Sequence, residues 1–134
     1  MDDRHTDQFE GDAEYVFSIR ARITSADPDV RVEPAAVETT LFKRAPRPGD
    51  DGWLFFRDHL WRGEINDEAP VRALATDALG VDVDAVSFRE LRTDETYYEA
   101  LKDEIAANLE LFNATDVAEV VNKYLGSSVH VREK

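Results

Sequence analysis

The spacing of apolar residues changes once along this chain, from every second position to every third or fourth. Residues 14–24 alternate strictly, with Tyr15, Phe17 and Ile19 on one side, which is typical of a strand with one buried face. From residue 66 onward the apolar positions mostly follow the helical period. A strand-rich half followed by a helix-rich half predicts an α+β fold.

Two further strands are predicted in the first half. Residues 37–44 read as a strand, and residues 53–57 are mostly apolar and aromatic. The intervening residues 46–52 contain two prolines and two glycines, which favours a turn. The sequence therefore predicts a wide hairpin whose return strand is 53–57.

Three helices are predicted in the second half. The first begins near Asn66 or Asp67 and ends at Gly80, because such residues cap helix ends. The second and longest begins at residues 93–95, where Thr, Asp and Glu are typical of a helix start. Its predicted core-facing stripe comprises Tyr98, Leu101, Ile105, Leu109 and Phe112.

The third helix is predicted to begin at Asn113 or Thr115 and to end at Gly126. Strands are expected over residues 83–91 and 128–131. Together these elements predict a mainly antiparallel sheet of four or five strands, with about three helices packed on one face. The helix after the third strand is expected to give one parallel crossover.

The charge balance is strongly acidic: 29 Asp and Glu stand against 16 Lys and Arg, for a formal net charge of −13. Such a surface repels itself in dilute buffer, whereas at molar salt the screening length falls to about 3 Å. The content of 43% apolar residues argues against a disordered acidic chain. The composition therefore predicts a folded protein with a salt-adapted surface.

Length and composition also predict the domain organisation. Residues 1–12 contain five acidic residues and no apolar stretch, so we expect a disordered acidic tail followed by one domain over residues 13–134. Neither a signal sequence nor a membrane anchor is apparent, and cysteine is absent. We expect a cytoplasmic protein without disulfides or cysteine-held metals.

The acidic excess is uneven. Residues 15–62 hold eight basic and seven acidic side chains, so the strand-rich region is nearly neutral on an anionic molecule. This region is a candidate surface for a negatively charged partner. The alternative is that its arginines pair with carboxylates on neighbouring strands.

The most unusual segment carries Arg57, Trp61 and Arg62. A tryptophan beside an arginine can clasp a strand to the following helix, and the same pair is typical of binding hot spots. Residues 60–64 read Leu-Trp-Arg-Gly-Glu. With residues 86–95 and 124–128, this run resembles the haloarchaeal LWR-salt protein family. The resemblance implies a salt-loving host and carries no assigned activity or catalytic residues.

An enzyme is the alternative function. His59 lies near Asp58 and Glu64, and an acid–base pair needs a histidine within hydrogen-bond reach of a carboxylate. Metal ligands at recognised spacing, phosphate loops and nucleophile elbows are absent, so no metal or cofactor is predicted. Nucleic acid is not expected as a partner, because the acidic charge is explained by salt adaptation.

We therefore predict a non-catalytic binding or adaptor domain that holds a protein or an anionic ligand. Its oligomeric state is left open by the sequence. The candidate contact residues are Arg57, His59, Trp61, Arg62 and Glu64.

Overall fold

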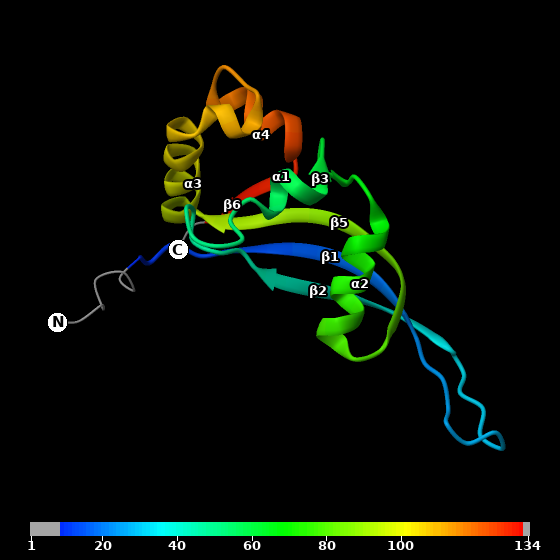
Figure 1. Ribbon diagram of the computed structural model, residues 1–134. Helices are drawn as coiled ribbons and strands as arrows, with labels where there is room; N and C mark the ends of the chain where they lie inside the picture. Colours follow the sequence, from blue (N-terminus) through cyan, green and yellow to red (C-terminus); the bar gives the residue numbers. More distant parts are fainter. Residues whose placement is uncertain (1–8, 133–134) are drawn as a thin grey trace.

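The computed structural model describes residues 9–132 and places one four-stranded sheet beside a layer of helices (Figure 1). The strand order is β2-β1-β5-β6. The strands are β1 (Ala13–Arg22), β2 (Ala36–Arg44), β5 (Asp82–Asp94) and β6 (Val129–Arg132). β1 runs antiparallel to both β2 and β5, whereas β6 runs parallel to β5. The α+β fold predicted from the sequence is confirmed.

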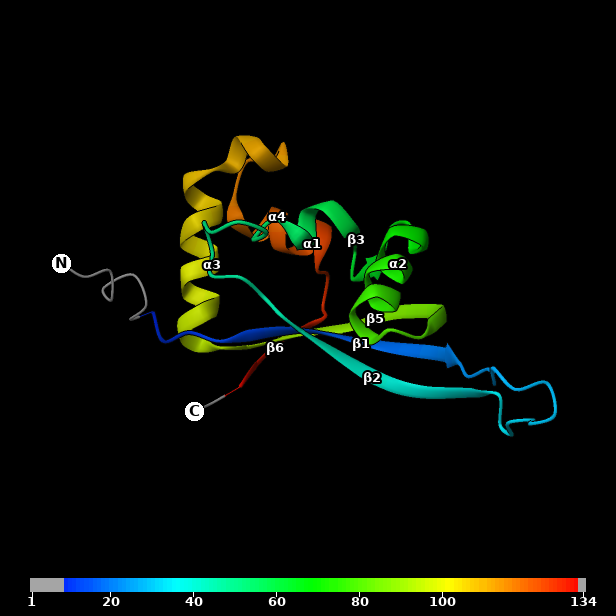
Figure 2. The same ribbon diagram turned by 60° about the horizontal axis from the view of Figure 1, so that its bottom comes forward.

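The helices all lie on one side of this sheet, as Figure 2 shows. They are α1 (Phe55–His59), α2 (Glu68–Leu79), α3 (Glu95–Ala107) and α4 (Val117–Tyr124), with a short 3-10 helix at Leu109–Phe112. A two-stranded hairpin of β3 (Leu60–Trp61) and β4 (Glu64–Ile65) joins α1 to α2. No helix or strand within residues 9–132 covers the opposite face of the sheet.

The core forms between the helix layer and the alternating apolar positions of the strands. Phe17 of β1 lies in register with Leu41 of β2 and Phe88 of β5. Above the sheet, Phe56 stacks on Phe112 with ring centroids 5.7 Å apart. Both rings are 1% exposed, so this contact lies deep in the core.

Residues 53–57 do not form the predicted return strand. Phe55 and Phe56 belong to α1, and both are buried. In a strand these neighbours would point to opposite faces, whereas here both point into the core: Phe55 packs against Tyr15 of the sheet and Phe56 against the helices. A short apolar run does not distinguish a strand from a buried helix.

Aspartates begin the three longer helices. The side chain of Asp67 accepts from Ala69 N, that of Asp94 from Tyr97 N, and that of Asp116 from Glu119 N. The predicted starts at Asp67 and at residues 93–95 agree with this, but Asp116 takes the role expected of Asn113 or Thr115.

Two further details differ from the sequence prediction. The buried tyrosine of α3 is Tyr97, which is 2% exposed, and Tyr98 is only partly buried. The parallel crossover runs from β5 through α3 and α4 to β6, not through the helix after the third strand. The sequence does not reveal strand order, because pairing depends on contacts between distant segments.

Most of the predicted acidic tail lies outside the described residues. The part that is described contacts the domain: the ring of Phe9 packs edge-on against Tyr97 at 6.2 Å, and Asp12 N donates to Asp94 Oδ2 at 3.0 Å. Contacts with the domain therefore begin before residue 13.

Candidate functional site

The uncovered face of the sheet is the candidate site, and we call it the open face. It carries the β1 side chains that alternate with the core residues, together with their neighbours on β2, β5 and β6. Its basic residues are Arg20, Arg22, Arg44, Arg89, Arg92, His130 and Arg132, and its acidic residues are Glu14, Glu38, Asp82, Asp84 and Glu90. On a chain with 29 acidic and 16 basic residues, this is a distinctly less acidic surface.

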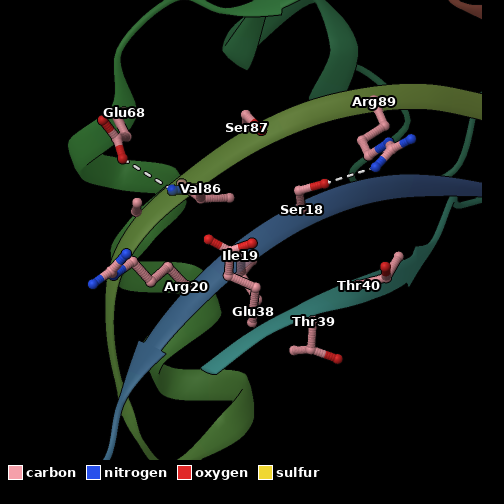
Figure 3. Close-up of a pocket in the computed structure, with 11 residues that line it drawn as sticks. Ser18, Ile19, Arg20, Glu38, Thr39, Thr40, Glu68, Val86, Ser87 and Arg89 are labelled. Carbon is pink, nitrogen blue, oxygen red and sulfur yellow. Dashed lines mark hydrogen bonds between the residues drawn. The ribbon is translucent and has the colours of Figure 1, made fainter. Parts of the chain in front are cut away.

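A row of hydroxyl groups crosses the middle of the open face. Ser18 of β1 lies opposite Thr40 of β2 and opposite Ser87 of β5. Figure 3 shows these three residues on neighbouring strands. Hydroxyls both donate and accept hydrogen bonds, so the row can contact a polar ligand.

A β-bulge brings Arg89 over this row. The register between β1 and β5 shifts at Val16/Phe17, which leaves Arg89 without a direct partner on β1. Its Nη1 donates to Ser18 Oγ at 3.1 Å (Figure 3). Bulges redirect side chains in this way and are frequent beside functional sites.

The row and the arginine line an open hollow of about 570 Å³. Arg20 and Glu38 stand at one end of it, and Glu68 of α2 reaches its other side (Figure 3). The Glu68 carboxylate already has a hydrogen-bond partner there, since its Oε2 accepts from Val86 N at 3.0 Å. The volume lies within the range usual for small-molecule sites.

Some arginines of the open face are paired. Arg22 Nη2 lies 3.0 Å from Asp84 Oδ2, and Arg92 Nη2 lies 2.7 Å from Glu90 Oε2. In contrast, Arg44, Arg89 and Arg132 make no ion pair within residues 9–132. These three guanidinium groups have charge and donors available to an external anion.

Glu90 contacts two basic side chains of the open face. His130 Nδ1 lies 2.5 Å from its Oε1, and Arg92 holds the other oxygen. Burial raises the pKa of Glu90, but the hydrogen bond and charge of Arg92, aided by His130, outweigh burial and lower it overall. Glu90 therefore stays ionised and ties β6 to β5.

The Trp61-Arg62 pair lies at the turn between β3 and β4. The β3–β4 turn has positive φ at Arg62 (55°) and at Gly63 (83°), the conformation of a tight hairpin turn. Arg62 N donates to Lys123 O at 2.8 Å, and Gly63 N donates to Tyr124 O at 3.0 Å. The turn thus satisfies carbonyl groups at the end of α4 that would otherwise lack partners.

Close backbone contact explains the glycine of this turn. A Cβ on Gly63 would lie 3.0 Å from Leu125 O, and one on Gly126 would lie 3.1 Å from Arg62 O. Trp61 itself is 46% exposed and packs edge-on against Tyr124 at 5.8 Å. The Arg62 guanidinium lies 5.9 Å from the Trp61 ring. The segment clasps the hairpin to α4, mainly through backbone.

The remaining predicted site residues do not assemble around His59. Its ring packs against Phe55 at 4.6 Å, and no hydrogen bond or ion pair joins its side chain to a carboxylate in the described part of the chain. Asp58 is instead held by Arg57, whose Nη2 lies 2.8 Å from its Oδ1. Glu64 lines a separate hollow of about 320 Å³ beside Ser87.

Sequence reasoning missed Ser18, Ser87 and Arg89. The alternation of β1 placed Ser18 on the polar side, which was a usable signal. No local sequence pattern indicated that Thr40 and Ser87 would align with Ser18, or that a bulge would place Arg89 over these hydroxyl groups.

No cluster of three or more His, Asp or Glu side chains suited to a metal occurs within residues 9–132. Over the same residues, no helix is both long enough and apolar enough to cross a membrane.

Comparison with known proteins identifies a family. A family model described as LWR-salt protein matches residues 11–134, nearly the whole chain. Neither a curated protein nor a solved structure gives a significant match.

Proposed function

Because this chain belongs to the LWR-salt protein family, whose description names no activity, we propose a function from geometry: a non-catalytic binding module that holds an anionic ligand on the open face. The ligand carries a carboxylate or a phosphate group. It occupies the hollow between Arg20, Ser18 and Arg89.

The unpaired arginines carry this proposal. Carboxylates outnumber basic groups almost two to one in the sequence, so an arginine finds an internal partner easily. Nevertheless Arg44, Arg89 and Arg132 have no carboxylate partner among the described residues, all three lie on the open face, and Arg89 lines the hollow. An arginine fork matches carboxylate and phosphate oxygens, which supports an external anion as the partner.

The hydroxyl row supports the same ligand chemistry. The side chains of Ser18, Thr40 and Ser87 are short and lie on paired strands, so little side-chain entropy is lost when they bind. They can donate to oxygens of a ligand while Arg89 supplies charge. A rigid strand platform also positions contacts better than a loop does.

An enzyme centred on His59 has less support. His59 packs on Phe55 rather than on a carboxylate, and Asp58 is engaged by Arg57. An acid–base mechanism needs the histidine and the carboxylate within hydrogen-bond reach. The three residues would have to rearrange before they could act together.

We also propose that the protein works in a concentrated-salt cytoplasm. The net charge of −13 is tolerated more easily where ions screen it. High salt also weakens anion binding to exposed charges, so the hollow must contribute hydrogen bonds as well as charge.

The test is an NMR titration in molar potassium chloride at constant ionic strength, with inorganic phosphate and succinate as separate probes. We expect amide shifts at Ser18, Thr40 and Ser87, and their loss in Arg89→Gln. Arg57→Gln is the matched control, because Arg57 lies on the helix side and is paired with Asp58. The proposal fails if neither probe shifts these amides, or if Arg89→Gln binds like the wild type.

A further inference from the structure

The strand β2 ends the sheet with an exposed edge. Ala45 N donates to Ala13 O at 2.9 Å and Ile23 N donates to Ala35 O at 2.7 Å. Along an antiparallel pair of strands, residues that bond to the neighbouring strand alternate with residues that do not. The odd-numbered residues of β2 therefore bond to β1. The even-numbered residues, from Ala36 to Arg44, therefore direct their backbone N–H and C=O groups away from the sheet.

The charges on this edge are arranged symmetrically. Glu38 and Arg44 each lie three residues from Leu41, on the open face. Neither makes an ion pair within residues 9–132. An antiparallel copy of β2 centred on Leu41 would place each Glu38 opposite the Arg44 of the other copy.

We propose that a second copy of this chain pairs with β2 in that register, so that the two sheets join into one of eight strands. Thr40 of each copy then lies opposite Phe42 of the other. Both residues direct their backbone groups outward, so each such pair is hydrogen-bonded. Leu41 lies opposite Leu41 in a non-bonded pair at the two-fold axis. The interface is isologous, as closed dimers usually are.

Apolar surface beside the edge fits the same partner. Phe42 of β2 is 47% exposed on the open face, and Leu74 of α2 is 45% exposed on the helix side of the same edge. Both line a mostly apolar hollow of about 250 Å³, together with Leu41 and Ala78. A second copy would cover part of this surface, whereas a monomer leaves it in water at a free-energy cost.

The other edge of the sheet is less suited to pairing. β6 has four residues against nine for β2 and pairs with β5 only at residues 91–94, and short edge strands resist addition of another strand. The part of β5 before Leu91 also lies at this edge, but it is interrupted by two register shifts. Long, flat edges without a proline or bulge are the ones that recruit partners. β2 pairs with β1 without a register shift, so it is the edge of that kind.

Dimerisation also changes the proposed ligand hollow, of which Glu38 is a lining residue. A free Glu38 carboxylate repels an anion there. An ion pair with Arg44 of the second copy neutralises that charge. The dimer itself does not depend on the proposed ligand, so its test is performed without one.

The first test is charge reversal, with molar mass measured by light scattering in molar potassium chloride. The wild type is expected at twice the chain mass. Glu38→Arg and Arg44→Glu each place like charges opposite one another, and each should raise the dimer dissociation constant about tenfold or more. The double reversal Glu38→Arg with Arg44→Glu should restore the dimer. A monomeric wild type, or single variants that dimerise normally, would overturn the proposal.

The second test fixes the register, and the absence of native cysteine makes it clean. Leu41→Cys places two thiols opposite each other at the axis, within disulfide reach, so oxidation should link the chains. Thr39→Cys is the matched control, because it faces Lys43 and its two copies lie too far apart to bond. Linkage of Thr39→Cys in preference to Leu41→Cys would contradict the register. Circular dichroism checks that both variants fold.

Discussion

The two faces of the sheet are built from the same strands and have opposite chemistry. On the helix side, Tyr15, Phe17 and Leu91 are each 1% exposed. On the open face, Ser18 is only partly buried and Arg20 is exposed. The apolar side chains of the helix face pack within the molecule, whereas on the open face Arg44, Arg89 and Arg132 have no carboxylate partner among the described residues. Stability is therefore expected to depend on the first face, and recognition on the second.

The helix face should give the largest effect on mutation. Phe56→Ala removes a ring that is 1% exposed and contacts Trp53, Phe112 and Tyr124. We expect a loss of about 3–5 kcal/mol in the free energy of unfolding. Arg89→Gln on the open face should change it by less than about 0.5 kcal/mol. Urea denaturation in molar potassium chloride measures both, and similar losses would refute the division between the faces.

Salt withdrawal should act on the whole acidic surface. The net charge of −13 is screened at molar salt and repels itself in dilute buffer. We expect the melting temperature to fall by at least several degrees as potassium chloride is removed at neutral pH. Thermal scans by circular dichroism measure this, and an unchanged midpoint would argue against salt adaptation.

The turn that docks on α4 should give an intermediate effect. Gly63→Ala introduces a Cβ at φ 83°, only 3.0 Å from Leu125 O, and we expect a loss of about 1–3 kcal/mol. Trp61→Ala should lower the free energy of unfolding by less, because the Trp61 side chain is 46% exposed. Urea denaturation compares the two variants. A larger loss for Trp61→Ala would show that the side chain, not the backbone, holds the turn.

The smallest effect concerns Glu90 and has a definite sign with pH. The folded-state pKa of Glu90 is lowered, so its stabilising contribution is present above the ordinary pKa of a glutamate. That contribution is lost as the pH falls through the lowered value. Glu90→Gln should therefore be slightly less stable than the wild type at neutral pH, by less than about 1 kcal/mol. The free energies of unfolding of the variant and the wild type, measured by urea denaturation, should converge as the pH falls. A difference between them that grows in acid would contradict this assignment.

Much of the fold was predictable because local patterns agree with it. The alternation of residues 14–24 matches β1, and Asp67 and Asp94 cap the helices that their positions indicate. The strand predicted at residues 53–57 is a helix for a physical reason. Phe55 is buried against the sheet, and Phe56 is buried against the helices. A period of two or of 3.6 cannot be recognised in five apolar residues.

The candidate site was less predictable, because it depends on register. The arginine-rich character of residues 15–62 was visible, and Arg20 and Arg44 do lie on the open face. Arg89 reaches the site only through a bulge in β5. The Leu-Trp-Arg run was conspicuous by composition, but its backbone contacts with α4 depend on the distant residues 123–126.

The most direct test of the account is the double variant Arg89→Gln and Arg132→Gln in molar potassium chloride. One set of samples is used to measure the free energy of unfolding and the amide shifts caused by inorganic phosphate and succinate. The account predicts unfolding within about 1 kcal/mol of the wild type, together with loss of the shifts at Ser18, Thr40 and Ser87. Strong destabilisation of the variant, or anion-induced shifts like those of the wild type, would contradict it.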